Sequence, residues 1–126
     1  MRFLVRLSGL LLLAGCHVGP ALSQFGPAGG HFSLRTSSAT VQGELLAATD
    51  SSLIVFEGQR VTEVRYISLT SASIRPDGPR LHPRVVPSRA DLARLRSLSR
   101  FPQGLSPELL QRFREENQIT AELRRL

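Results

Sequence analysis

Apolar and polar residues alternate along residues 31–75 in short runs that end at turn-forming residues. The turns fall at Ser37-Ser38, at Thr49-Asp50-Ser51 and at Glu57-Gly58-Gln59. Branched and aromatic side chains are frequent within the runs, as in half-buried strands. Five such runs lie in residues 32–34, 41–47, 52–56, 60–67 and 69–74. Their spacing predicts a small antiparallel five-stranded barrel or curled sheet.

Gly43 interrupts the second of these runs. A glycine inside a strand weakens the strand and usually marks a bend, a bulge or a close approach of another backbone. A small barrel needs such a bend to wrap around its core. We therefore expect Gly43 to lie at a bend, the alternative being a surface glycine with no special role.

The pattern changes after residue 75. Four prolines and an Asp-Gly pair in residues 76–87 predict an irregular connector. Residues 88–126 then form a C-terminal helical segment of one or two helices. Ser88 and Asp91 resemble a capping box that opens a helix over residues 88–100, with its leucines on one side. Ser106-Pro107 opens a second helix, which we expect to bend or break near Asn117.

The first sixteen residues read MRFLVRLSGLLLLAGC. Two arginines precede a short apolar stretch, which is far below the roughly 20 residues that a spanning helix needs. The end of this segment, Leu13-Ala14-Gly15-Cys16, closely resembles the lipobox of bacterial lipoproteins. The resemblance implies that residues 1–15 are a signal peptide. It also implies that Cys16, the single cysteine of the chain, becomes the lipidated N-terminus.

Residues 16–30 join this anchor to the rest of the chain. Glycine and proline recur too often here for a helix or a strand, so we expect a flexible tether that spans at most about 45–50 Å. The lipobox resemblance places the protein in the cell envelope. His17 follows the cysteine where an Asp would signal retention in the inner membrane, which favours the outer membrane in a cell with two membranes.

Residues 41–76 resemble the Sm-like small β-barrels. Val41-Gln42-Gly43-Glu44-Leu45, with Asp50, Leu53 and Val55 after it, is similar to their first motif, and Ile74-Arg75-Pro76 stands where their second motif has Ile-Arg-Gly. Ile54 occupies the place of the family's RNA-contacting Asn, and Pro76 replaces the Gly. The resemblance therefore implies the architecture and not RNA binding, and we expect no nucleic-acid partner.

The charge of the chain is concentrated in residues 75–100. All 16 basic residues are arginines, against 10 acidic residues, for a formal net charge of +6. The segment holds seven of these arginines and only two aspartates. On the predicted helix Arg89, Arg96 and Arg100 lie within about 40° of one another. This stripe is a candidate contact for anionic phospholipid or another anionic envelope polymer. The alternative is a solvated face whose leucines pack on the sheet.

Motifs of catalysis, cofactor binding and metal binding are missing from the sequence. The three histidines are far apart, and none of the common catalytic or nucleotide-binding patterns occurs. We therefore expect no catalytic residue, cofactor or metal, and interpret the chain as a lipid-anchored, non-enzymatic binding or scaffolding module with an envelope protein as a further partner. The alternatives are a structural protein that lies on the membrane through a basic amphipathic helix, and a hydrolase whose residues meet only in the fold.

Overall fold

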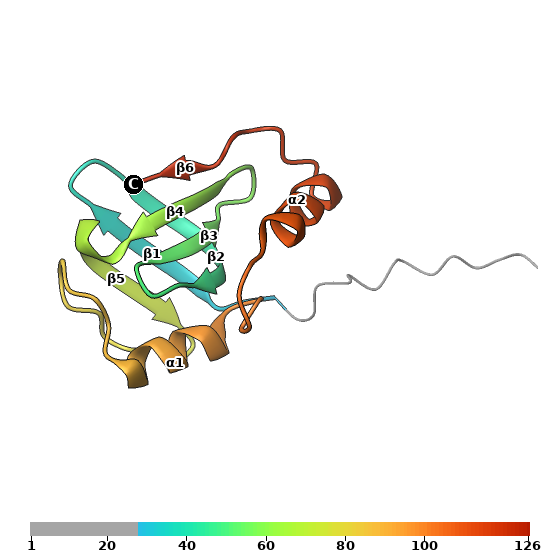
Figure 1. The fold of residues 1–126 in the computed structure, drawn as a ribbon. Coiled ribbons are helices and arrows are strands. Elements are labelled where there is room, and N and C mark those ends of the chain that lie inside the picture. Colours follow the sequence, from blue (N-terminus) through green and yellow to red (C-terminus); the bar gives the residue numbers. More distant parts are fainter. Residues whose placement is uncertain (1–27) are drawn as a thin grey trace, which may run out of the picture.

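The computed structural model describes residues 28–126, so the predicted signal peptide, Cys16 and most of the tether lie outside the described residues. Six strands, two α-helices and one 3₁₀ turn follow one another along this part of the chain (Figure 1). Their bounds are β1 (His31–Thr36), β2 (Thr40–Ala48), β3 (Ser52–Phe56), β4 (Val61–Arg65), η1 (Tyr66–Ser68), β5 (Leu69–Arg75), α1 (Arg89–Leu98), α2 (Pro107–Glu116) and β6 (Arg124–Arg125).

The five predicted strands are confirmed, but they do not close into a barrel. The sheet has the order β5-β1-β2-β3-β4-β6, and β6 pairs with β4 in parallel. The turn η1 carries the chain from β4 to β5, and β5 pairs with β1 at the other side of the sheet. The edge of β4 is occupied by β6 instead of β5. Of the two predicted architectures, the structure therefore agrees with the curled sheet and not with the closed barrel, and the sheet is six-stranded and mixed instead of five-stranded and antiparallel.

The inner face of the sheet carries the larger of two apolar clusters. Alternate residues of β1, namely Phe32 and Leu34, are fully buried there, as the alternating pattern predicts. Tyr66 is buried in the same cluster, and its hydroxyl donates to the carbonyl oxygen of Thr49 at 2.8 Å. Desolvation by burial raises the pKa of Tyr66 above its usual value. Leu95 of α1 belongs to this cluster, so α1 covers the inner face that strand pairing does not enclose.

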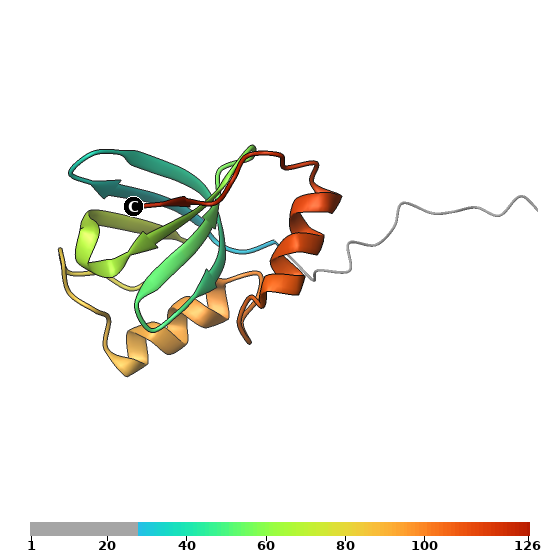
Figure 2. The same ribbon diagram turned by 45° about the horizontal axis from the view of Figure 1, so that its top comes forward.

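A second apolar cluster lies on the outer face of β2, β3 and β4. Leu46 and Val61 contribute from the strands, and Phe101, Phe113 and Ile119 contribute from α2 and its flanking segments. The rings of Phe56 and Phe113 meet edge to face with centroids 5.1 Å apart. In both Figure 1 and Figure 2, α1 and α2 lie on different sides of the sheet. The sheet is thus buried on both faces where α2 covers it.

Gly43 lies at a close approach of two strand backbones, and the register irregularity of β2 falls later, between Leu45 and Ala47. The φ of Gly43 is +153°, and a Cβ built on it would lie 2.0 Å from the carbonyl oxygen of Phe56. The end of β3 therefore passes so close to β2 that only a residue without a side chain fits at this point.

Both helix starts follow the predicted capping. The hydroxyl of Ser88 accepts from the backbone N–H of Asp91 at 3.2 Å, and that of Ser106 accepts from Leu109 at 3.1 Å. The helix α2 ends at Glu116 and is followed by Asn117 as its C-cap, next to which the sequence predicts a break. The helix α1 ends at Leu98, however, so Arg100 lies beyond it and not on a helical stripe.

Candidate functional site

Two of the three arginines of the predicted stripe are bound within the domain. The guanidinium of Arg96 donates to the carboxylate of Asp50 at 2.8 Å and to the carbonyl oxygen of Ala48 at 3.2 Å. That of Arg100 makes a two-pronged ion pair with Glu44, in which Nη2 lies 3.0 Å from Oε2. Arg100 also lies over the ring of Phe113, 5.6 Å from its centroid. Arg96 and Arg100 thus fasten the end of α1 and the chain after it to the sheet.

The remaining arginines of residues 75–100 are exposed. Within residues 28–126 none of these five makes an ion pair: Arg75, Arg80, Arg84, Arg89 and Arg94. Arg94 donates to the carbonyl oxygen of Asp77 at 2.7 Å, which leaves its charge uncompensated. Arg89 is therefore the one member of the predicted stripe that is available to an external anion.

The exposed arginines of the connector and α1 precede and follow two exposed valines along the chain. Val85 and Val86 have 54% and 50% of their surface accessible, and Ile67 is the only other large apolar residue of the described chain that is as exposed. Both valines line a shallow hollow together with Arg80 and Asp91. The neighbouring connector is held on the sheet, because the backbone N–H of Arg84 donates to the carbonyl oxygen of Leu69 at 2.9 Å. We call the surface formed by Arg80, Arg84, Val85, Val86, Arg89 and Arg94 the basic connector surface.

The chain from Cys16 joins the domain beside α1. The backbone N–H of Gly30 donates to the carbonyl oxygen of Leu98 at 2.7 Å, and that of Gly29 donates to Glu44 at 2.8 Å. Both glycines, which the sequence assigns to the tether, are thus bonded to the domain. Because α1 is about 15 Å long, the basic connector surface begins within about 15 Å of the point where the tether joins.

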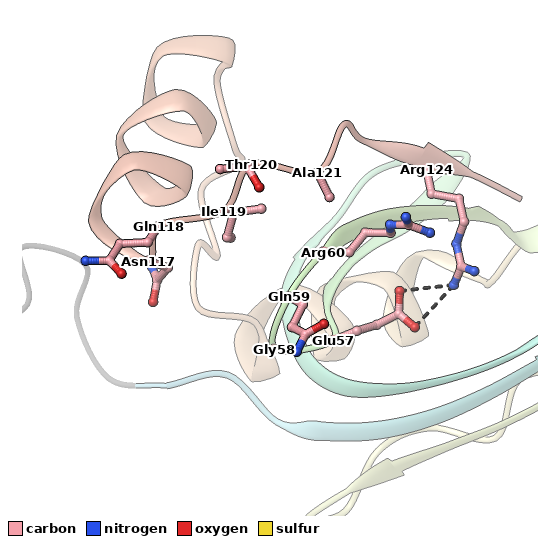
Figure 3. A pocket seen from close by; sticks show the side chains of 10 residues that line it. All are labelled: Glu57, Gly58, Gln59, Arg60, Asn117, Gln118, Ile119, Thr120, Ala121 and Arg124. Atoms are coloured by element: carbon pink, nitrogen blue, oxygen red, sulfur yellow. Dashed lines mark hydrogen bonds and ion pairs between the residues drawn. The ribbon is translucent and has the colours of Figure 1, made fainter.

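A polar cleft lies between the turn after β3 and the segment that follows α2 (Figure 3). Its volume is about 820 Å³. One wall is formed by residues 57–60, and the opposite wall by residues 117–121 together with Arg124. The side chains that line it are Glu57, Gln59, Arg60, Asn117, Gln118, Ile119, Thr120, Ala121 and Arg124, with Gly58 at the turn.

Glu57 is the only acidic residue of the cleft lining, and its carboxylate is already bound. Arg124 Nη2 lies 3.0 and 3.2 Å from its two oxygens, and the Thr62 hydroxyl donates to it at 2.6 Å. Arg60 is exposed, and it makes no ion pair within the described part of the chain. The lining therefore has an excess of positive charge and of hydrogen-bond donors.

Known proteins do not identify this site. No known family matches the chain, and no curated protein or solved structure is significantly similar to it. Among residues 28–126 there is no group of three or more side chains that could hold a metal ion. No helix in the same range is both long and apolar enough to cross a membrane.

Sequence reasoning missed the cleft and the partners of Arg96 and Arg100. The two walls of the cleft are about sixty residues apart in the chain, and neither wall contains a motif. Asp50 lies in a predicted turn and Glu44 in a predicted strand. Carboxylates are common at such positions, so nothing in the sequence indicates that these two bind arginines. Only the three-dimensional arrangement brings these groups together.

Proposed function

We propose that the protein is a lipid-anchored, non-enzymatic binding module of the cell envelope whose domain docks on the anionic surface of its own membrane. The observation that carries the proposal is the basic connector surface, in which the exposed Val85 and Val86 lie in the same stretch of chain as four exposed arginines that make no ion pair within residues 28–126. Exposed arginines next to exposed apolar side chains suit the boundary between headgroups and acyl chains.

The lipid anchor is supported by the lipobox and by the single cysteine of the chain. A lone thiol in an exported protein cannot form an internal disulfide, and lipidation explains its presence. The intact mass of protein extracted from membranes tests this part. An N-terminal Cys16 that carries acyl mass supports the anchor, and a mature protein that starts elsewhere without acyl mass excludes it.

The position of the tether favours docking through this particular surface. The chain from Cys16 joins the domain at the end of α1, within about 15 Å of the basic connector surface, so a tether of at most about 45–50 Å lets this surface reach the bilayer. Each arginine near an anionic surface contributes about 1 kcal/mol, and the attraction fades within about 8 Å at physiological salt. Four arginines therefore suffice to orient a domain that the lipid already holds nearby.

Sedimentation with vesicles tests the docking. The chain from residue 17 onward, which has no lipid, is mixed with vesicles of phosphatidylcholine alone or with vesicles that also contain the anionic lipid phosphatidylglycerol. We expect binding only to the anionic vesicles and weakening by salt. Replacing Arg84 and Arg89 with Gln should weaken binding about thirtyfold, because two contacts of about 1 kcal/mol each are lost.

The matched control replaces Arg112 and Arg125 with Gln. Both are exposed, and they lie on α2 and on β6, outside the connector and α1. This variant changes the net charge by the same amount. If the two double variants lose binding equally, the attraction depends on net charge alone and the basic connector surface is not a docking site.

A further inference from the structure

The polar cleft lies on the opposite side of the sheet from α1. Figures 1 and 2 both place α1 below the sheet and place β4 and β6, which border the cleft, toward its other side. A domain that docks through the basic connector surface therefore turns the cleft away from the bilayer. The cleft is then open to a ligand in the envelope. Ligand binding in the cleft does not itself require that the domain is docked on the membrane.

The turn wall of the cleft presents a cation that no group among residues 28–126 neutralises. Glu57 is bound by Arg124 and by Thr62, so it does not pair with Arg60 as well. Figure 3 shows the Arg60 side chain extending from the turn toward Arg124, at the end of the cleft where Glu57 lies. In addition, Arg124 Nε is buried and has no acceptor in the described structure. The guanidinium of Arg60 can therefore donate two hydrogen bonds to a carboxylate or another oxyanion of a ligand.

The opposite wall presents groups that suit a peptide backbone. The backbone N–H groups of Thr120 and Ala121 have no hydrogen-bond partner among residues 28–126. On the turn wall, the side-chain amide of Gln59 is likewise exposed and unbonded in that range, whereas Figure 3 shows the side chain of Gln118 pointing away from the turn. Free N–H groups and amides can pair with the carbonyl and N–H groups of an extended chain, as in strand addition.

The size and composition of the cleft narrow the ligand class. A volume of about 820 Å³ is in the range of sites for small ligands. No aromatic residue lines the cleft, and the one tyrosine of the chain is buried in the inner cluster, so a sugar ring would find no stacking platform. We propose that this cleft binds a short acidic peptide in extended conformation, with a carboxylate of the peptide on Arg60.

Amide chemical shifts of the lipidated protein in neutral detergent micelles test the proposal. The probe is an acetylated, C-terminally amidated tetrapeptide of alternating Ala and Glu, and its counterpart has Gln in place of Glu and therefore no carboxylate. We expect shifts confined to residues 57–60 and 117–124 with the acidic peptide. The Gln peptide, and the acidic peptide with Arg60→Gln, should bind about tenfold more weakly, as loss of one charged hydrogen-bonding contact implies.

Arg35→Gln serves as the matched control, because Arg35 is an exposed arginine of β1 outside the cleft. It should bind the acidic peptide with unchanged affinity. Equal affinity of the Arg60→Gln variant and the unaltered protein would overturn the proposal. It would also be overturned if neutral chitin oligosaccharides shifted the cleft residues while the acidic peptide did not. Vesicle binding is measured separately, so a failure of the acidic peptide to bind the cleft does not count against the docking proposal.

Discussion

Leu45 and Leu46 are neighbours in β2 and are both fully buried, but they belong to different apolar clusters. Leu45 faces the inner cluster, which α1 covers. Leu46 faces the outer cluster, which α2 and its flanking segments cover. The inner cluster is built mainly from strand residues between 32 and 74, whereas most of the outer cluster comes from residues 101–123.

The difference shows how a short open sheet is stabilised here. A closed barrel would enclose its core by strand pairing alone. In this protein the strands stop short of closure, and each exposed apolar face is covered by one helix. The two helices are therefore not appendages of the sheet, because each supplies buried side chains that the sheet lacks, Leu95 on the inner face and Phe113 on the outer face.

Gly43 is where the largest effect of a single substitution is expected, because it lies where β2 and the end of β3 approach most closely. A Cβ here would lie 2.0 Å from the Phe56 carbonyl oxygen, so the backbone of β2 or β3 has to move and both clusters loosen. We expect Gly43→Ala to lower the free energy of unfolding by at least about 3 kcal/mol. Urea denaturation measures this change.

Gly104 provides the control for Gly43. It also has a positive φ, +109°, but a Cβ on it would meet nothing within 4 Å. Gly104→Ala should therefore cost only the backbone strain, about 1 kcal/mol. Equal costs at the two glycines would mean that the close approach of β3 to Gly43 is not what makes this position intolerant.

Truncating Leu45 or Leu46 distinguishes the two clusters directly. Leu45→Ala and Leu46→Ala should each lower the free energy of unfolding by about 3 kcal/mol, since each leaves a cavity in a fully buried site. Their local effects should differ. Hydrogen exchange should accelerate in α1 for Leu45→Ala and in α2 for Leu46→Ala. Identical exchange patterns for the two variants would show that the clusters open as one unit.

The inner cluster could be predicted from the sequence and the outer one could not. In β1 the buried Phe32 and Leu34 alternate with polar residues, and this pattern identifies one buried face. The run Leu53-Ile54-Val55-Phe56 is continuously apolar, which is typical of a strand buried on both faces. The apolar run therefore indicates that the outer face of this strand is also buried, but it does not indicate that residues 101–123 bury it.

The same limit applies to the charged residues. Sequence reasoning grouped Arg89, Arg96 and Arg100 because a continuous helix would align them. The helix ends at Leu98, and the carboxylates that bind Arg96 and Arg100 are 46 and 56 residues away in the chain. Ion pairs between residues so far apart in the chain produce no periodic pattern in the sequence. The sequence therefore predicts the stripe but not the tertiary contacts that bind two of its three arginines.

The smallest expected effects concern the two ion pairs that fasten α1 and its end to β2 and to the following turn. The side chains of Arg100 and Glu44 are only 15% and 18% exposed, whereas those of Arg96 and Asp50 are 42% and 88% exposed. Glu44→Gln leaves a largely buried guanidinium without its counter-ion and the Gly29 N–H with a weaker acceptor, so we expect a loss of about 2 kcal/mol. Asp50→Asn breaks a pair that water already screens and should cost less than about 1 kcal/mol.

Urea denaturation at low and at high salt separates the two cases. The small effect of Asp50→Asn should vanish at high salt, while that of Glu44→Gln should persist because solvent ions do not reach the pair. If both losses disappeared with salt, the end of α1 would not be fixed by a buried ion pair. The packing of Leu95 and Phe113 would then have to hold the two helices unaided.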